Sequence, residues 1–233
     1  MKIKNIVLFL CLLFFGTGKS QANENQRSLF FSLGSNCEIA TVLGHYNLRH
    51  LAGPLDWLLT LDYDRFLLLI ENDFEGLVDE QFLTQYPDNH VINSYYNIDF
   101  RHDWTELNFE IKLPEIQSRL RRRVNRILDL KHYDGKVYFI RGAFDTSINP
   151  FLPTITKQCT KITPQDAENL KNVLQKKYPN LDFTLIIINY YEESDCEFNS
   201  NLERIMEFKV CKLNRKKREE DYKAIMEFLM TLK

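Results

Sequence analysis

The stretch Leu29-Phe-Phe-Ser-Leu-Gly-Ser-Asn-Cys37 decides the fold of this chain. Its apolar first half predicts a buried strand, and Gly34-Ser35 predicts a turn. Apolar residues then recur at the spacing of one helix face, at Ile39, Val42, Leu43 and Tyr46. The sequence therefore predicts a strand that turns directly into a helix, with Cys37 in the first turn of that helix.

The position of Cys37 suits a nucleophile. Unpaired backbone N–H groups and the positive end of the helix macrodipole favour the thiolate over the thiol. The same N–H groups, in the segment of Ser35 and Asn36, are candidates to hold the oxyanion of an acyl-transfer reaction. The other interpretation is that Cys37 is a small buried hydrophobic residue, as most free cysteines are.

The first 22 residues have the features of a cleaved signal peptide. Lys2 and Lys4 precede an apolar run at residues 6–15, and Ser20-Gln-Ala22 places small residues where a signal peptidase cuts. The apolar run is about half the ~20 residues that span a bilayer. We therefore expect a secreted or periplasmic protein with no stable membrane insertion after cleavage; an uncleaved anchor is the alternative.

Residues 23–233 are expected to form a single domain, because their 211 residues can build one substantial core. Without the signal segment the chain carries 27 basic and 32 acidic residues, a net charge of −5. This balance argues against a nucleic-acid binder. The sequence contains no metal-ligand cluster, phosphate-binding loop or dinucleotide fingerprint, so we expect no metal and no cofactor. The oligomeric state stays open.

Four cysteines remain after the signal segment. If Cys37 is catalytic, at most two of Cys159, Cys196 and Cys211 can pair with each other in an oxidising compartment. Their spacing is unlike that of zinc ligands. The sequence does not choose among the pairings.

Strand and helix patterns alternate along the rest of the chain. Expected strands cover residues 136–141, 181–190 and 204–213, and expected helices cover 113–130, 164–178 and 219–233, with an irregular loop at 144–163. Before residue 113 we expect a buried helix that ends near Asn72 and a short strand within 93–100. The last helix begins with acidic residues and ends at Lys233, as the macrodipole favours.

This order predicts an α/β fold. We expect a three-layer sandwich with a mostly parallel sheet and a helical insertion after the first strand–helix unit. In such sheets the functional site lies at the carboxyl ends of the strands. Cys37 and Arg141 would gather there, because Arg141 ends the strand at 136–141 beside a glycine.

Three further polar residues are candidates for the site. His102 follows an aromatic segment and has the side chain whose ordinary pKa lies nearest neutrality, so it could be a general base. It could equally be a surface histidine in a loop. Asp103 is next to His102 in the sequence but would point to the opposite face if the segment is a strand. Asp56 lies in an apolar stretch and is either a helix cap, the commoner role, or an orienting carboxylate.

Arginines gather on one side of the helix expected at 113–130. They are Arg119, Arg121, Arg122, Arg123 and Arg126. They could form a surface for an anionic ligand. A solvated helix face is the commoner structure, and the acidic balance of the chain favours it.

Several blocks of the sequence resemble a bacterial family described as putative papain-like cysteine peptidases. The blocks are Ser32-Leu-Gly-Ser-Asn-Cys37, Gly53-Pro-Leu-Asp-Trp57, Phe100-Arg-His-Asp-Trp104 and Val137-Tyr-Phe-Ile-Arg141, in that order. The resemblance covers most of residues 29–190. It departs from the family pattern at Leu55 and Trp104, where the family favours phenylalanine.

The resemblance implies Cys37 as the nucleophile and His102 as its base, with Asp103 and Asp56 as competing third groups. It implies a peptide or other acyl substrate. The residue pattern itself still predicts a parallel α/β sheet, so "papain-like" would describe the Cys–His chemistry and not the fold.

The leading hypothesis is a thiol hydrolase or acyl transferase that uses Cys37 and His102, with Ser35, Asn36 and Arg141 near the substrate or oxyanion. The alternative is a non-enzymatic module that binds an anion such as phosphate at the Gly34-Ser35 turn, with Cys37 structural. A weaker third possibility is a serine esterase with Ser35 as nucleophile, but the expected Asp-x-x-His near the C-terminus is absent.

Overall fold

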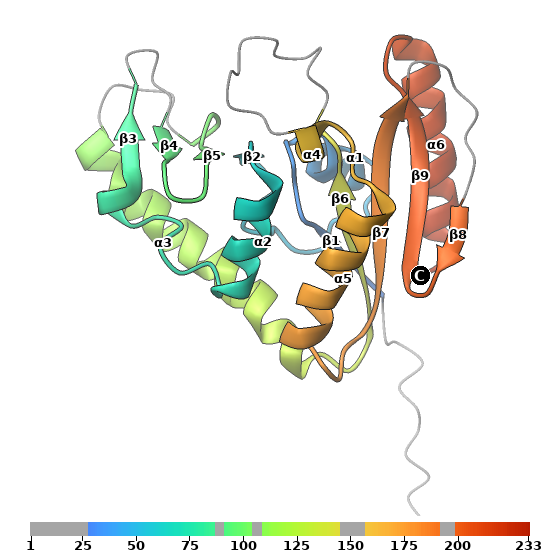
Figure 1. Cartoon of the computed structure of the whole chain (residues 1–233), viewed down its shortest axis with the longest axis horizontal. Helices are drawn as coiled ribbons and strands as arrows, with labels where there is room; N and C mark the ends of the chain where they lie inside the picture. The colour runs from blue at the N-terminus through green and yellow to red at the C-terminus, as the bar shows by residue number, and fades with distance from the viewer. Residues whose placement is uncertain (1–27, 87–90, 104–108, 145–156, 192–198) are drawn as a thin grey trace, which may run out of the picture.

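A computed structural model describes residues 28–86, 91–103, 109–144, 157–191 and 199–233. Its large sheet has the strand order β1-β6-β7-β9-β8 (Figure 1). The first four strands are parallel, namely β1 (Leu29–Ser32), β6 (Lys136–Gly142), β7 (Asp182–Tyr191) and β9 (Ile205–Cys211). Only β8 (Asn199–Leu202), paired with β9, is antiparallel. The predicted α/β fold with a mostly parallel sheet is confirmed.

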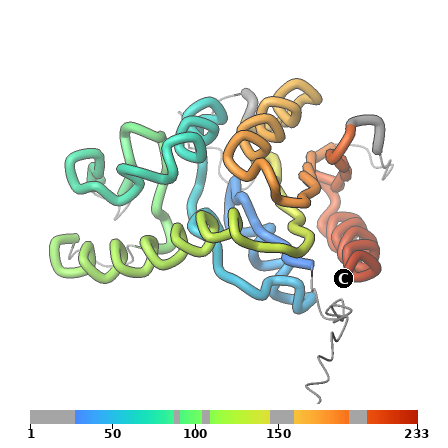
Figure 2. The backbone as a smooth tube through the Cα atoms, turned by 90° about the horizontal axis from the view of Figure 1, so that it is seen from below, coloured from blue at the N-terminus to red at the C-terminus, as the bar shows by residue number. Residues whose placement is uncertain are grey.

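Helices pack on both faces of this sheet because its strands are apolar on both sides. Alternate residues such as Phe30, Ile140 and Ile186 belong to one buried cluster with α1 (Glu38–His45) and α6 (Arg215–Met230). Their sequence neighbours belong to a second cluster with α2 (Tyr63–Glu71), α3 (Phe109–Leu128) and α5 (Pro164–Lys177). Figure 2 shows α5 and α6 on opposite sides of the sheet. The continuous apolar runs of β6 and β7 therefore mark central strands.

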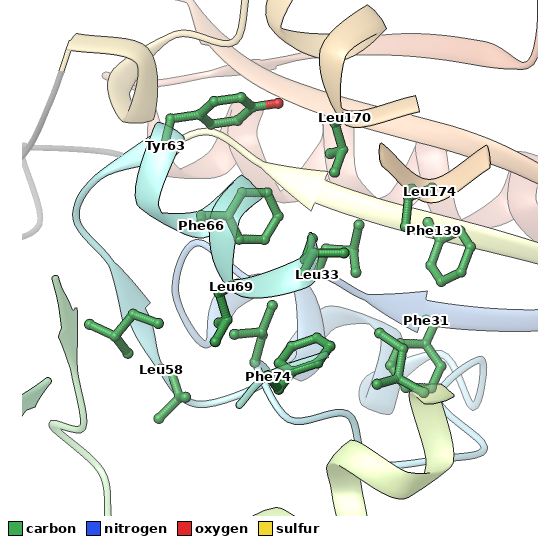
Figure 3. Packing of buried hydrophobic residues seen from close by; sticks show 14 of the residues in the cluster. Phe31, Leu33, Leu58, Tyr63, Phe66, Leu69, Phe74, Phe139, Leu170 and Leu174 are labelled. Atoms are coloured by element: carbon green, nitrogen blue, oxygen red, sulfur yellow. The ribbon is translucent and has the colours of Figure 1, made fainter. Parts of the chain in front are cut away.

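The second cluster is the larger core of the molecule. Figure 3 shows Phe139 of β6 and Phe31 of β1 in the same cluster as Leu170 and Leu174 of α5. Phe139 has no exposed surface and packs edge-on against Phe183 at 5.7 Å between ring centroids. This packing fixes the carboxyl ends of β1 and β6, where the candidate site residues begin.

The insertion between α1 and β6 is only partly helical. Besides α2, α3 and the short helices η1 (Glu80–Phe82) and η2 (Asp129–His132), it contains a four-stranded antiparallel sheet. Its order is β2 (Leu59–Thr60), β5 (Ile98–Asp99), β4 (Val91–Asn93) and β3 (Leu83–Gln85). The prediction of a helical insertion was wrong on this point, because strands of two or three residues are too short to show a period.

The structure differs from the expected elements at α3, α4 and α6. The helix α3 begins at Phe109, whose ring packs against the core, so Pro114 lies inside the helix and not in its first turn. A short helix, α4 (Lys157–Thr160), lies in the segment expected to be an irregular loop. The helix α6 begins at Arg215 and not at Glu219, so its first turn is basic and the macrodipole expectation was wrong.

Local hydrogen bonds explain the early start of α6. The Asn214 side chain accepts from the Lys217 N–H at 3.0 Å and caps the helix. The basic side chains find acceptors close by: Arg218 donates to the Cys211 carbonyl at 3.1 Å, and Lys217 pairs with Asp221 at 3.2 Å. The cap and these contacts offset the unfavourable position of basic residues at a helix N-terminus. By contrast, α5 begins at Pro164 as expected, and Thr163 and Asp166 form a capping box there.

Some expectations fall outside the part of the chain that the structure describes. These are the signal peptide at residues 1–22, Cys196 and most of the loop at 144–163. In the described ranges, no helix combines the length and apolar character needed to cross a membrane.

We predict that Asn214→Ala lowers the free energy of unfolding by about 1 kcal/mol, because it removes the cap of α6. Chemical denaturation of the wild type and the variant measures the difference. Asn214→Asp restores a capping oxygen and should recover most of the stability. A neutral effect of Asn214→Ala would contradict a helix start at Arg215.

Candidate functional site

The turn between β1 and α1 has a strained backbone. Gly34 has φ +72° and Ser35 has φ +111°, a region that a side-chain-bearing residue rarely adopts. A Cβ on Gly34 would lie 2.8 Å from the Leu55 carbonyl oxygen, so only glycine fits there. Strain of this kind persists where the surrounding structure enforces it, and it often lies at functional sites. Cys37 follows directly at the N-terminus of α1.

Hydrogen bonds to β6 hold this turn in place. The Ser35 hydroxyl donates to the Ala143 carbonyl at 3.1 Å, and Arg141 Nη1 donates to the Leu33 carbonyl at 2.9 Å. The Asn36 side chain accepts from the Glu38 N–H at 2.9 Å. Ser35, Asn36 and Arg141 are all buried. In this structure their bonds lie within the protein, so their contact with a substrate or oxyanion stays a prediction.

Cys37 carries a reduced, partly exposed thiol. Burial raises the pKa of this thiol above its ordinary value, the neighbouring Glu38 carboxylate raises it further, and the backbone N–H of Cys37 lowers it. We expected the helix N-terminus to favour the thiolate, but desolvation is the larger effect here. The resting thiol is therefore protonated at neutral pH. Cys159 and Cys211 are also reduced in the structure, and both are buried.

His102 lies on an exposed turn at residues 101–103, not on a strand. Its ring meets the ring of Trp57 edge-on, with 6.0 Å between the centroids. Ser35 pairs with Leu59 of β2, and Leu59 pairs with Asp99 of β5. One strand therefore separates the backbone that leads to Cys37 from the backbone that leads to His102, and within the described ranges no hydrogen bond joins the two side chains.

The two candidate carboxylates have other partners. Asp103 pairs with Arg119 at 2.5 Å. Asp56 Oδ2 accepts from Arg49 Nε at 2.8 Å and from the Gly53 N–H at 2.9 Å. Within the described part of the chain neither carboxylate accepts a hydrogen bond from His102. Cys37, His102 and these two carboxylates therefore do not form an assembled triad in the structure as described.

Asp56 is not a helix cap, because Asp62 caps α2 by accepting from the Arg65 N–H at 3.0 Å. Asp56 is 1% exposed, and burial raises its pKa against the lowering effects of Arg49 and the Gly53 N–H. Its role in this structure is to tie the loop before Trp57 to Arg49.

The sequence interpretation missed an arginine cluster that surrounds these carboxylates. It consists of Arg49, Arg119 and Arg123. Arg49 lies over the Trp57 ring at 5.6 Å, and burial lowers the pKa of Arg123 while Asp103 and Asp56 raise it. The solvated-face interpretation of the α3 arginines is therefore wrong for Arg119 and Arg123. Their spacing of four residues places them on one helix face, which was the available signal.

This cluster joins α3 to the two segments that carry Trp57 and His102. Arg119 holds the His102 turn through Asp103, and Arg49 contacts both Asp56 and Trp57. Across the described ranges, no three His, Cys, Asp or Glu side chains gather in an arrangement that could hold a metal ion.

A family profile described as "Putative papain-like cysteine peptidase" matches residues 28–193. That range includes the β1–α1 turn, Cys37, the insertion and His102. No curated protein matches the chain, and no solved structure matches it.

We predict that Glu38→Gln lowers the pKa of the Cys37 thiol, because it removes a negative charge that raises this pKa. Iodoacetamide labelling of Cys37 across pH 6–11, followed by mass spectrometry, should place the wild-type midpoint above the free-thiol value of ~8.5 and the variant midpoint lower. The exposed Glu71→Gln is the matched control and should leave the midpoint unchanged. A wild-type midpoint well below ~8.5 would contradict the protonated resting state.

We predict that Asp56→Asn lowers the free energy of unfolding by about 1–3 kcal/mol, because Arg49 and the Gly53 N–H lose a charged acceptor. The exposed Asp129→Asn should have no measurable effect in the same denaturation experiment. The Cys37 labelling midpoint should be the same in both variants. A shift of that midpoint in Asp56→Asn would instead indicate that Asp56 acts on the Cys37 site.

Proposed function

Because the chain belongs to the family of putative papain-like cysteine peptidases, we propose that it is a cysteine hydrolase in which Cys37 attacks a peptide or other acyl carbonyl. One observation carries this proposal: a strained, glycine-dependent turn at the carboxyl edge of a parallel sheet presents a reduced, partly exposed thiol at a helix N-terminus. Strand-to-helix turns of this kind present nucleophiles in other hydrolases.

The protonated resting thiol determines the type of mechanism. A general base must remove the Sγ proton as Sγ bonds to the carbonyl carbon, in the manner of a serine hydrolase. The tetrahedral intermediate then collapses to a thioester, and the departing amine or alcohol takes the proton from the base. Water, deprotonated by the same base, hydrolyses the thioester and regenerates the thiol.

We propose His102 as that base. It is exposed, and no hydrogen bond to another described residue fixes its imidazole. The proposal requires the turn at 101–103 to approach Cys37 when substrate binds, since catalytic hydrogen bonds are often long before a substrate is present. Asp103 then serves as an anchor of this turn on Arg119 and not as the third member of a triad.

The oxyanion would bind close to the Cys37 backbone. The Glu38 N–H already donates to Asn36, so it is not available without a rearrangement of that side chain. The Cys37 N–H lies beside Sγ and is the donor best placed to bond the oxyanion.

The anion-binding alternative at the Gly34-Ser35 turn has less support. A carboxylate, Glu38, occupies the first turn of α1 and would repel a phosphate there. Ser35 is fully buried and its hydroxyl donates to Ala143, which also weakens the serine-esterase alternative. For the cellular setting we keep the proposal that residues 1–22 direct secretion.

We predict that Cys37→Ala abolishes hydrolysis in a panel of nitrophenyl esters and peptidyl coumarin amides, while the far-UV circular dichroism and the denaturation midpoint stay close to wild type. Cys37→Ser should retain a trace of activity or none. Activity of Cys37→Ala equal to that of the wild type would refute Cys37 as the nucleophile.

We predict that His102→Ala lowers kcat/KM by about 10²–10⁴, the usual contribution of a general base. The matched control is His132→Ala, which removes another exposed histidine and should leave kcat/KM unchanged. A kcat/KM of His102→Ala equal to that of the wild type would assign the base to another group.

A further inference from the structure

Arg141 is a fully buried arginine that pairs with no carboxylate of the described residues. It lies near the carboxyl end of β6, on the face of the sheet that α2 covers. Its guanidinium carbon is 4.0 Å from the centroid of the Phe66 ring and 5.9 Å from that of Tyr63. Figure 3 shows the side chains of Tyr63, Phe66 and Leu33 around this end of β6.

One edge of this guanidinium is unused. Nη1 donates to the Leu33 carbonyl at 2.9 Å, but Nε and Nη2 are buried and have no acceptor among the described residues. The Nε–H bond and one Nη2–H bond point in parallel, and together they form the edge that binds a carboxylate through both of its oxygens. The unused edge is therefore a bidentate donor.

In the described part of the chain, no carboxylate offsets the charge of Arg141. Burial lowers its pKa, yet a guanidinium remains protonated at neutral pH. The acidic groups that act on it are the Cys159 thiol and the Tyr63 hydroxyl, and burial raises the pKa of Tyr63, so that hydroxyl is neutral. The Phe66 ring attracts the cation but supplies no full charge. A bound water would satisfy the N–H groups, whereas an anion would satisfy the N–H groups and the charge.

We propose that the Nε/Nη2 edge of Arg141 binds a small planar monovalent oxyanion, a carboxylate, between the end of β6 and α2. This site is linked to the turn before Cys37, because Arg141 also holds the Leu33 carbonyl, one residue before Gly34. An anion there would stabilise the strand end from which the strained turn begins. The proposal does not depend on catalysis by Cys37.

The test measures the melting temperature of the full chain at increasing concentrations of formate. Formate replaces fluoride in the buffer, so that the ionic strength stays constant. We expect a rise that grows with the logarithm of the formate concentration and reaches about 5–10 °C when formate is at 100 times its dissociation constant. Titration calorimetry of the wild type should show one formate site per chain. Formamide, the neutral analogue of formate, should give neither the rise nor the heat.

Two variants locate the effect. Arg141→Lys keeps the charge but loses the bidentate edge, and Arg141→Met loses both; each should lose the formate-dependent rise. Arg215→Met removes an exposed arginine and should keep it. If both Arg141 variants fail to fold, the wild-type comparison of formate with formamide still decides, because a neutral molecule of the same shape cannot replace the anion.

The size of the bound ligand distinguishes a free small carboxylate from a carboxylate on a larger molecule. Binding of formate but not of N-acetylglycine indicates a free small carboxylate, and tighter binding of N-acetylglycine indicates a carboxylate on a larger ligand. A rise with chloride that equals the rise with formate would overturn the carboxylate assignment. No such rise with formate in the wild type, or an equal rise in Arg141→Met, would overturn the site.

Discussion

The close approach of the β1–α1 turn to the loop that carries Leu55 is the constraint on which the rest of the structure depends. Gly34 adopts a positive φ with its Cα facing the Leu55 carbonyl, and Ser35 pairs with Leu59. This pairing connects the edge strand of the parallel sheet to the first strand of the antiparallel sheet. The two sheets therefore share one backbone junction, and Cys37 begins a helix two residues beyond it.

The junction also explains why polar residues that looked catalytic form hydrogen bonds within the protein here. Ser35, Asn36 and Arg141 each donate to or accept from backbone groups near the turn. A tight turn with two positive φ values leaves backbone groups out of the regular ladder, and buried groups must find partners. Side chains supply these partners. The few residues that constrain the turn are therefore also the candidates for the chemistry of the site.

The sequence predicted the parts of the fold that have long periodic patterns. The strands β6, β7 and β9 and the helix α5 were found because continuous apolar runs and a Thr-Pro cap are strong local signals. The antiparallel sheet was not found, because its strands have two or three residues and depend on pairing with distant segments. The start of α6 was missed because a single asparagine cap outweighs four basic residues in the first turn.

The candidate site was predictable in part for a related reason. The strand–turn–helix context of Cys37 is local, so it could be inferred from neighbouring residues. The partner of Asp103 is not local in the same way: Arg119 lies on a helix that the sequence presents as solvated, and its role depends on how α3 crosses the insertion. Long-range ion pairs of this kind have no periodic signature in the sequence.

Buried charged residues fall into two groups in the described part of the chain. The arginine cluster and its two carboxylates largely neutralise one another and join α3 to the Trp57 and His102 segments. No carboxylate of the described residues offsets the charge of Arg141 at the strand end that precedes the turn. Burial raises the pKa of the Cys37 thiol. Under the mechanism proposed above, with Cys37 as the nucleophile and His102 as its base, the two would react only when a ligand brings them together. If the chain is secreted, as proposed, this coupling would protect the thiol in an oxidising environment, because the thiolate is the form that oxidants attack.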